Sequence, residues 1–177
     1  MADTSSGAQL SAPKAALITA AVLVVVAILI GIYMLLDITP LFAGFLFALY
    51  WAGIKHTDFK EFAPALVGGL GGLALAAGLH HLPQLYGNAG LAAALVVVVL
   101  AIYAQIRNSV PLLVNASFML YLTVGTIPAV GAQEDYPGMA FALIVGAAYC
   151  GGLVWLMGRL AGAKAQTAAP QTDTSLG

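Results

Sequence analysis

The six lysine and arginine residues of this chain lie at its two ends and in every second gap between long apolar segments. The other gaps contain no lysine or arginine. Because Lys and Arg that flank membrane spans are retained on the cytoplasmic side, this alternation predicts six crossings with both termini in the cytoplasm. The positive residues are Lys14, Lys55, Lys60, Arg107, Arg159 and Lys164, and the gaps without them carry Asp37, His80, His81, Glu134 and Asp135.

The scarcity of charge excludes a water-soluble protein. Hydrophobic residues make up 62% of the 177 residues and charged residues only 7%, whereas a soluble domain has about 25% charged residues. Six spans of about 20 residues each leave room for short loops and two tails. We therefore expect the protein to be embedded in the lipid bilayer. The net charge of −1 gives no indication of a nucleic-acid partner.

The apolar segments predict an all-α polytopic membrane protein. A helix satisfies its own backbone hydrogen bonds in hydrocarbon, so even the segments rich in β-branched residues should be helical. Residues 15–160 should form the membrane domain, and the small, polar residues 1–14 and 161–177 should be disordered cytoplasmic tails. The expected helices are 15–36, 38–54, 62–79, 88–106, 110–130 and 137–158, with Pro83 in a loop.

A shift of 71 residues places several residues of the first half of the chain on identical residues of the second half. Matches of Pro, Phe and Tyr at one offset carry weight in a sequence dominated by Leu, Val and Ala. Each repeat has three helices, and because this number is odd, the second repeat enters the membrane from the opposite side. The pattern therefore predicts a 3+3 inverted repeat with halves at about 15–80 and 88–158. The pairs are Pro40 and Pro111, Leu41 and Leu112, Phe47 and Phe118, Leu49 and Leu120, Tyr50 and Tyr121, together with the near-isosteric Asp37 and Asn108.

The predicted repeat leads to two functional hypotheses. Inverted repeats are common in transporters and channels, which bind their solute near the membrane midplane where the repeats meet. The first hypothesis is therefore a transporter or channel for a small uncharged or weakly polar solute. Any small membrane protein can also be duplicated, so the alternative is a non-transporting accessory or scaffold protein that packs against a larger complex.

No Asp, Glu, Lys, Arg or His lies deep within a predicted span. Ionisable groups inside the membrane mark proton relays and ion pathways, so a carboxylate-coupled pump is disfavoured. Intramembrane hydrolysis needs a nucleophile with a base, or a metal. We therefore expect neither an enzyme nor a bound cofactor. A metal site is not expected either, because Cys150 is the only cysteine and His80 and His81 lie far in sequence from the nearest outer carboxylates.

Polar side chains within the spans are the candidates for a solute pathway. They concentrate in the fifth segment, and Tyr50 is the repeat counterpart of Tyr121 in the second. For Asn115, a hydrogen bond to a neighbouring helix is favoured over contact with solute. The two tyrosines fit either a pathway or a filled core with hydroxyls bonded to carbonyls. The candidate pathway residues are Tyr50, Asn115, Ser117, Tyr121 and Thr123.

Glycines recur at the spacing that brings helices close together. Gly68 and Gly72 are four residues apart, and stripes of small residues include Gly44 in the second segment and Gly146 in the sixth. Small residues allow the backbones of membrane helices to approach. We expect these four glycines to serve helix packing within the bundle. A backbone-lined pore or a contact in a homo-oligomer remains the alternative.

Three short motifs resemble a family of small bacterial inner-membrane proteins known only as domain of unknown function 1097. They are Leu41-Phe42-Ala43-Gly44-Phe45-Leu46 followed by Tyr50-Trp51, Ala104-Gln105-Ile106-Arg107 running into Val110-Pro111, and the Gly131–Asp135 loop. The resemblance covers about residues 17–158 and implies a multi-pass protein of the bacterial inner membrane. The family has no assigned activity. Its members have a small residue at the position of Asn115, where this chain departs from the pattern.

Overall fold

The computed structural model describes residues 11–131 and 135–167, with side chains as far as residue 160. All regular secondary structure in these ranges is helical. Three helices are long and apolar enough to cross a membrane: Ala12–Leu35, Phe59–Ile106 and Tyr136–Leu160. Two shorter apolar helices are Phe42–Ile54 and Ala116–Gly125. The prediction of a helical membrane protein is confirmed to this extent.

The chain divides into two compact units, Met1–Thr39 and Pro40–Gly177. The first unit contains α1 (Ala12–Leu35), which includes three residues predicted to belong to the N-terminal tail. Asp37 has a left-handed backbone (φ 54°), and this terminates α1 because the chain can no longer continue the helical ladder. The rest of both predicted tails, residues 1–10 and 168–177, lies outside the described residues.

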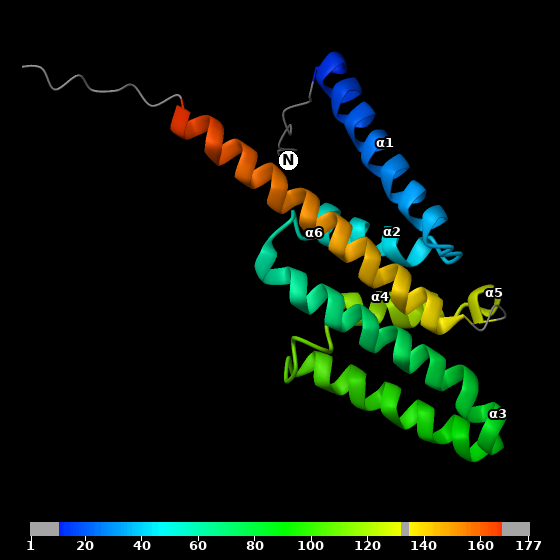
Figure 1. Ribbon diagram of the computed structural model, residues 1–177. Coiled ribbons are helices and arrows are strands. Elements are labelled where there is room, and N and C mark those ends of the chain that lie inside the picture. Colours follow the sequence, from blue (N-terminus) through cyan, green and yellow to red (C-terminus); the bar gives the residue numbers. More distant parts are fainter. Residues whose placement is uncertain (1–10, 132–134, 168–177) are drawn as a thin grey trace, which may run out of the picture. The chain divides into compact units, whose positions relative to one another are not determined.

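The second unit contains the remaining helices (Figure 1). The second predicted span begins later than expected, because Pro40 precedes it, and its last turn and a half is a π-helix. The last helix continues beyond the predicted end of the membrane domain. In chain order the elements are α2 (Phe42–Ala48), the π-helix η1 (Leu49–Ile54), the 3₁₀-helix η2 (Phe59–Glu61), α3 (Phe62–Ile106), α4 (Ala116–Gly125), α5 (Pro128–Gly131) and α6 (Tyr136–Thr167).

The helix α3 reverses direction at Gly87. Its 45 residues would extend about 70 Å if straight, more than twice the hydrocarbon thickness of about 30 Å. Gly87 instead has φ 59° and ψ −137°, a conformation that only glycine adopts readily. The two arms, 62–86 and 88–106, run back along each other (Figure 1). A Cβ on Gly90 would overlap the Leu82 carbonyl, so glycine is also required for this close return.

Two sequence predictions in this region are wrong. The third helix was expected to end at residue 79 with Pro83 in a loop, but Pro83 lies inside the first arm of α3. The single glycine at position 87 makes the reversal, so the helix can continue past the histidine pair to Tyr86. A proline within the arm costs one backbone hydrogen bond, and neighbouring packing tolerates such losses in membrane helices.

The fifth predicted span is also wrong as a single helix. Residues 110–115 form turns, α4 extends only from Ala116 to Gly125, and Pro128 begins the separate α5. The physical reason lies at the N-terminus of α4. The Asn115 side chain accepts a hydrogen bond from the Phe118 N–H and caps the helix there. Pro111 supplies no N–H to extend the helix backwards.

Two helix pairs form the core of the second unit. The first arm of α3 packs against α4, and α2 packs against α6. In both the first arm of α3 and α6 the buried positions recur every three or four residues along one face. They are Ala65, Gly68, Gly69, Gly72, Leu73 and Ala76 in α3, and Tyr136, Met139, Ala142, Leu143, Gly146, Ala147, Cys150 and Gly151 in α6.

The reversal at Gly87 can be tested by substitution. Gly87→Ala should lower the free energy of unfolding by about 1–3 kcal/mol, the usual cost of a residue held in a sparsely populated backbone region. No atom lies within 4 Å of the added Cβ, so backbone strain is the only cause. Gly78→Ala in the first arm is the matched control, because its Cβ makes only ordinary contact. Thermal unfolding in detergent gives the comparison, and an unchanged midpoint for Gly87→Ala would contradict the account.

Candidate functional site

A glycine-lined seam joins the first arm of α3 to α4. A Cβ on Gly68 would overlap the Asn115 side chain, and a Cβ on Gly72 would overlap the Phe118 carbonyl. A Cβ on Gly69 would lie 2.9 Å from the Tyr121 ring. The absence of side chains therefore lets the two backbones approach closely. Of the glycines expected to serve packing, Gly68 and Gly72 lie in this seam.

The other two glycines expected to serve packing, Gly44 and Gly146, are buried on α2 and α6. These two helices pack against each other as the second main contact of the unit. Both helix pairs of the core therefore carry buried glycine.

Asn115 joins α3 and the start of α4 by hydrogen bonds at one end of the seam. Its Nδ2 donates hydrogen bonds to the carbonyls of Pro64 on α3 (2.8 Å) and Pro111 in the preceding turn (3.0 Å). Its Oδ1 accepts the bond from Phe118 that caps α4. The structure thus contains the interhelical hydrogen bond that the sequence favoured for Asn115. The side chain also borders a cavity, described below.

Ser117 and Tyr121 lie at the centre of the seam and are fully buried. The Ser117 hydroxyl donates to the Ala65 carbonyl at 2.7 Å. The Tyr121 hydroxyl donates to the Ala43 carbonyl, which ties α4 to α2. Thr123 is exposed and bonds to Met119 within its own helix. None of these three residues lines either of the two cavities that follow.

The Tyr50 cavity lies beside the start of α3. It has a volume of about 480 Å³, and its walls come from the end of η1, the start of α3 and the turns before α4. A salt bridge of 2.9 Å joins Lys55 Nζ to Glu61 Oε2 on one wall. The hydrogen bond to Glu61 raises the pKa of Lys55, so the ammonium stays charged. The lining residues are Tyr50, Lys55, Glu61, Pro64, Asn108, Pro111, Leu112, Asn115 and Ala116.

Tyr50 has an unusual place in this cavity. Only 5% of its surface is exposed, and its hydroxyl has no hydrogen bond to any residue in the described part of the chain. It lies in the π-helix η1 next to Trp51, whose indole N–H donates to the Asp58 carbonyl at 2.8 Å. Trp51 also contacts the rings of Phe59 and Phe62. This aromatic cluster holds η1 and the following turn in place.

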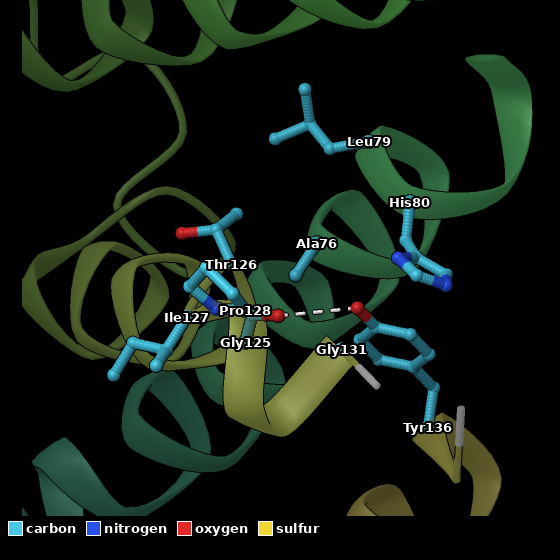
Figure 2. A pocket seen from close by; sticks show the side chains of 9 residues that line it. All are labelled: Ala76, Leu79, His80, Gly125, Thr126, Ile127, Pro128, Gly131 and Tyr136. Carbon is cyan, nitrogen blue, oxygen red and sulfur yellow. Dashed lines mark hydrogen bonds between the residues drawn. The ribbon is translucent and has the colours of Figure 1, made fainter. Parts of the chain in front are cut away.

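The His80 cavity lies near the other end of the first arm of α3. It has a volume of about 360 Å³, and Figure 2 shows the side chains that line it. The Tyr136 hydroxyl donates to the Gly125 carbonyl at 3.1 Å across its wall, and the Tyr136 and His80 ring centroids are 5.9 Å apart. The lining residues are Ala76, Leu79, His80, Gly125, Thr126, Ile127, Pro128, Gly131 and Tyr136.

The His80 cavity was not foreseen from the sequence. The sequence placed His80 in a gap between two predicted spans, and Tyr136 was not singled out. The cavity forms because α4 stops at Gly125 and Pro128 begins a new helix, which leaves space between α4 and α6. Proline two residues after a C-terminal cap is a usual helix-stop signal. It was the one available sign of this break.

The two cavities lie on one line along the first arm of α3. Pro64 borders the Tyr50 cavity and Ala76 borders the His80 cavity, which corresponds to a separation of about 18 Å along the helix. The glycine seam with Gly68 and Gly72 lies between them. The seam is closed, so the arrangement is two recesses, each lined by both polar and apolar residues, separated by a tightly packed centre.

Local backbone structure also recurs at the 71-residue offset. Asp37 and Asn108 both have left-handed backbones, with φ of 54° and 50°. The helices before them end with equivalent hydrogen bonds, and η1 and α4 end at Ile54 and Gly125, again 71 residues apart. The matched N–H to carbonyl pairs are Leu36–Ile32 with Arg107–Tyr103, Asp37–Met34 with Asn108–Gln105, and Ile38–Tyr33 with Ser109–Ala104.

Comparison with known proteins gives no relative for this chain. No protein-family model, no curated protein and no solved structure matches it. The resemblance to the family of domain of unknown function 1097 therefore stays a prediction. Within the described residues, no group of three or more His, Cys, Asp or Glu side chains is placed to hold a metal ion.

The closed seam predicts a position-specific response to a single methyl group. Gly72→Ala should destabilise the protein by about 1–3 kcal/mol, as overpacking does in well-packed interiors, because the new Cβ meets rigid backbone. Gly152→Ala on α6 is the control, since no atom lies within 4 Å of its Cβ. Chemical unfolding in detergent measures the difference. Equal stability of the two variants would show that the seam is not tight.

The cap at Asn115 gives a second test of the seam. Asn115→Ala removes the cap of α4 and the bond to Pro64, and should cost about 1–2 kcal/mol. Thr123→Ala removes only a bond within α4 on an exposed surface, so its unfolding midpoint should stay close to that of the wild type. If the two substitutions have the same effect, Asn115 does not join the helices as described.

Proposed function

We propose that this chain is a six-span membrane protein of two inverted triplets that passes a small, neutral polar solute across the membrane. The observation that carries the proposal is the pair of cavities at opposite ends of one closed seam. A binding region reached from alternate sides requires a recess on each side and a closed centre between them. The seam provides that centre, because its glycines bring α3 and α4 into contact.

The reversal of α3 supports six membrane crossings. Its two arms supply two crossings from one apolar helix. The short helices α2–η1 and α4, with the turns that flank them, supply two more. Broken helices are tolerated at membrane depth where the irregular backbone is buried or lines a cavity. Residues 110–115 fit this condition, since Pro111, Leu112 and Asn115 border the Tyr50 cavity.

The packing of the second unit supports an inverted repeat. In each proposed triplet the second helix is short and the third is long. The second helix of the first triplet, α2, packs on the third of the second triplet, α6. The second helix of the second triplet, α4, packs on the third of the first, which is the first arm of α3. In an inverted repeat a twofold axis exchanges these two pairs, and the matched helix ends support it.

The charges suggest the orientation and the class of solute. Lys55 lines the Tyr50 cavity, and Arg107 precedes Asn108 in its wall. The positive-inside rule therefore favours the cytoplasmic side of a bacterial inner membrane for this cavity. Lys55 and Glu61 are the charged residues of its lining, and they form a salt bridge with each other. A wall without net charge suits a neutral solute.

The scaffold hypothesis has a narrower basis. Gly68 and Gly72 pack against the α4 segment within the unit, so they offer no surface to a partner. Gly152 and Gly158 on α6 have no atom within 4 Å of an added Cβ, so this small-residue surface is open to a partner protein or a second copy of the chain. A scaffold needs no cavities along the seam, and for this reason we favour transport.

Flux into liposomes tests the proposed function. Purified protein should accelerate the entry of at least one of glycerol, urea or erythritol over protein-free vesicles, measured by light scattering after rapid mixing. Gly69→Leu, which places a large side chain against Tyr121 and Leu143 at the centre of the seam, should reduce this flux at least tenfold, while Gly152→Leu should not. Absence of flux from monodisperse wild-type protein would contradict transport.

A further inference from the structure

The second unit also has an apolar groove between the two arms of α3 and the segment around the start of α4. Its volume is about 400 Å³, and all of its lining residues are apolar. Small residues on the two arms, Gly71, Ala101 and Ala104, leave the space, and the partly exposed Leu100 and Leu113 border it. An empty apolar hollow loses the van der Waals contacts of its walls. In a bilayer, such a groove is therefore filled by lipid or by another helix.

An arginine lies on the groove side of the second arm, at the end of the helix. Arg107 follows the lining residue Leu100 by seven residues, or two turns, so both lie on one side of the arm, about 10 Å apart along its axis. The Arg107 Nη1 donates to the Tyr103 hydroxyl at 3.0 Å, and the guanidinium carbon lies 5.7 Å from the centroid of that ring. These contacts hold the side chain near the groove.

The Arg107 charge has no anionic partner within the chain as described. The salt bridge found among residues 11–131 and 135–160 joins Lys55 to Glu61, and no carboxylate in these ranges lies within salt-bridge distance of Arg107. A guanidinium has five N–H donors, and Tyr103 accepts from one of its nitrogens. Arg107 is therefore able to bind an anion from outside the chain.

We propose that the groove binds an acyl chain of an anionic phospholipid whose phosphate contacts Arg107. The chain fills the apolar space, and the phosphate supplies the negative charge that Arg107 lacks. Basic residues beside membrane helices on the cytoplasmic side are suited to anionic headgroups. Charge complementarity selects against a zwitterionic lipid, because the amine of its headgroup offsets the charge of the phosphate.

The lipid site is separate from the proposed solute pathway. No residue that lines the groove also lines the Tyr50 cavity or the His80 cavity. The inference therefore needs the second arm of α3 to lie in the membrane, and it does not depend on transport. A lipid held by both arms and by the α4 segment binds only the folded protein, so it also stabilises the fold by mass action.

Native mass spectrometry tests the site directly. The protein is released from detergent micelles that contain equal amounts of phosphatidylglycerol, which is anionic, and phosphatidylcholine, which is zwitterionic. The measured quantity is the fraction of protein that retains one molecule of each lipid. The wild-type protein should retain phosphatidylglycerol at least fivefold more than phosphatidylcholine.

Two arginine variants separate the groove from general attraction to anionic lipid. Arg107→Gln should lower the retention of phosphatidylglycerol about three- to fivefold, the effect of one cation near an anionic headgroup. Arg159→Gln is the matched control. Arg159 also lies over an aromatic ring four residues earlier, 4.3 Å from the centroid of Trp155, but α6 supplies no wall of the groove.

Two alanine variants test the acyl-chain part of the site. Ala104→Leu fills the groove and should lower the retention of phosphatidylglycerol at least fivefold. Ala92→Leu adds the same side chain at an exposed position of the same arm outside the groove, so retention should not change. If Ala104→Leu does not fold, the comparison of the two arginine variants decides.

Several outcomes would overturn the proposal. One is equal retention of the two lipids by the wild-type protein, and another is an equal effect of Arg107→Gln and Arg159→Gln. Retention of neither lipid by monodisperse wild-type protein would also overturn it and would leave α1 or a second copy of the chain as the occupant. Lipid retention is measured without solute, so a protein without flux can still uphold the site.

Discussion

The close approach of α3 and α4 is the contact on which the rest of the structure depends. Polar side chains of the α4 segment reach across it to backbone carbonyls of α3. Asn115 bonds to Pro64 and Ser117 to Ala65, and glycines on α3 leave room for both helices. In a membrane, apolar side chains gain little by leaving lipid, so close packing and interhelical hydrogen bonds must hold helices together. The same contact fixes where α4 begins and ends, and hence where the cavities lie.

Much of the fold could be predicted because the bilayer imposes simple rules on a sequence. The low charge and long apolar runs predict helices, and the helices in the described residues confirm it. The distribution of Pro, Phe and Tyr at one offset predicted a repeat, and the equivalent left-handed residues Asp37 and Asn108 are consistent with it. These features depend on local sequence, which is visible without the structure.

The breaks within the helices depend on tertiary contacts, and Pro128 was the one sign in the sequence of the break after α4. Hydropathy gives no sign that α4 begins at Ala116, because the capping side chain of Asn115 is held by a carbonyl 51 residues away. A reversal between residues 79 and 88 was predicted, but hydropathy gives no sign that the helix continues through Pro83 and turns at Gly87. Both cavities lie at such breaks. The candidate residues were therefore placed near the right helices, and two of them, Tyr50 and Asn115, border the Tyr50 cavity.

The central claim is that the cavities at the two ends of the seam open alternately. Distances between spin-label pairs in lipid nanodiscs measure this directly. One pair is at Leu112, which lines the Tyr50 cavity, and at Lys60, the neighbour of the lining residue Glu61. The other pair is at Leu79 and Ile127, which line the His80 cavity. The account predicts two distances for each pair. A single distance for each pair would contradict it.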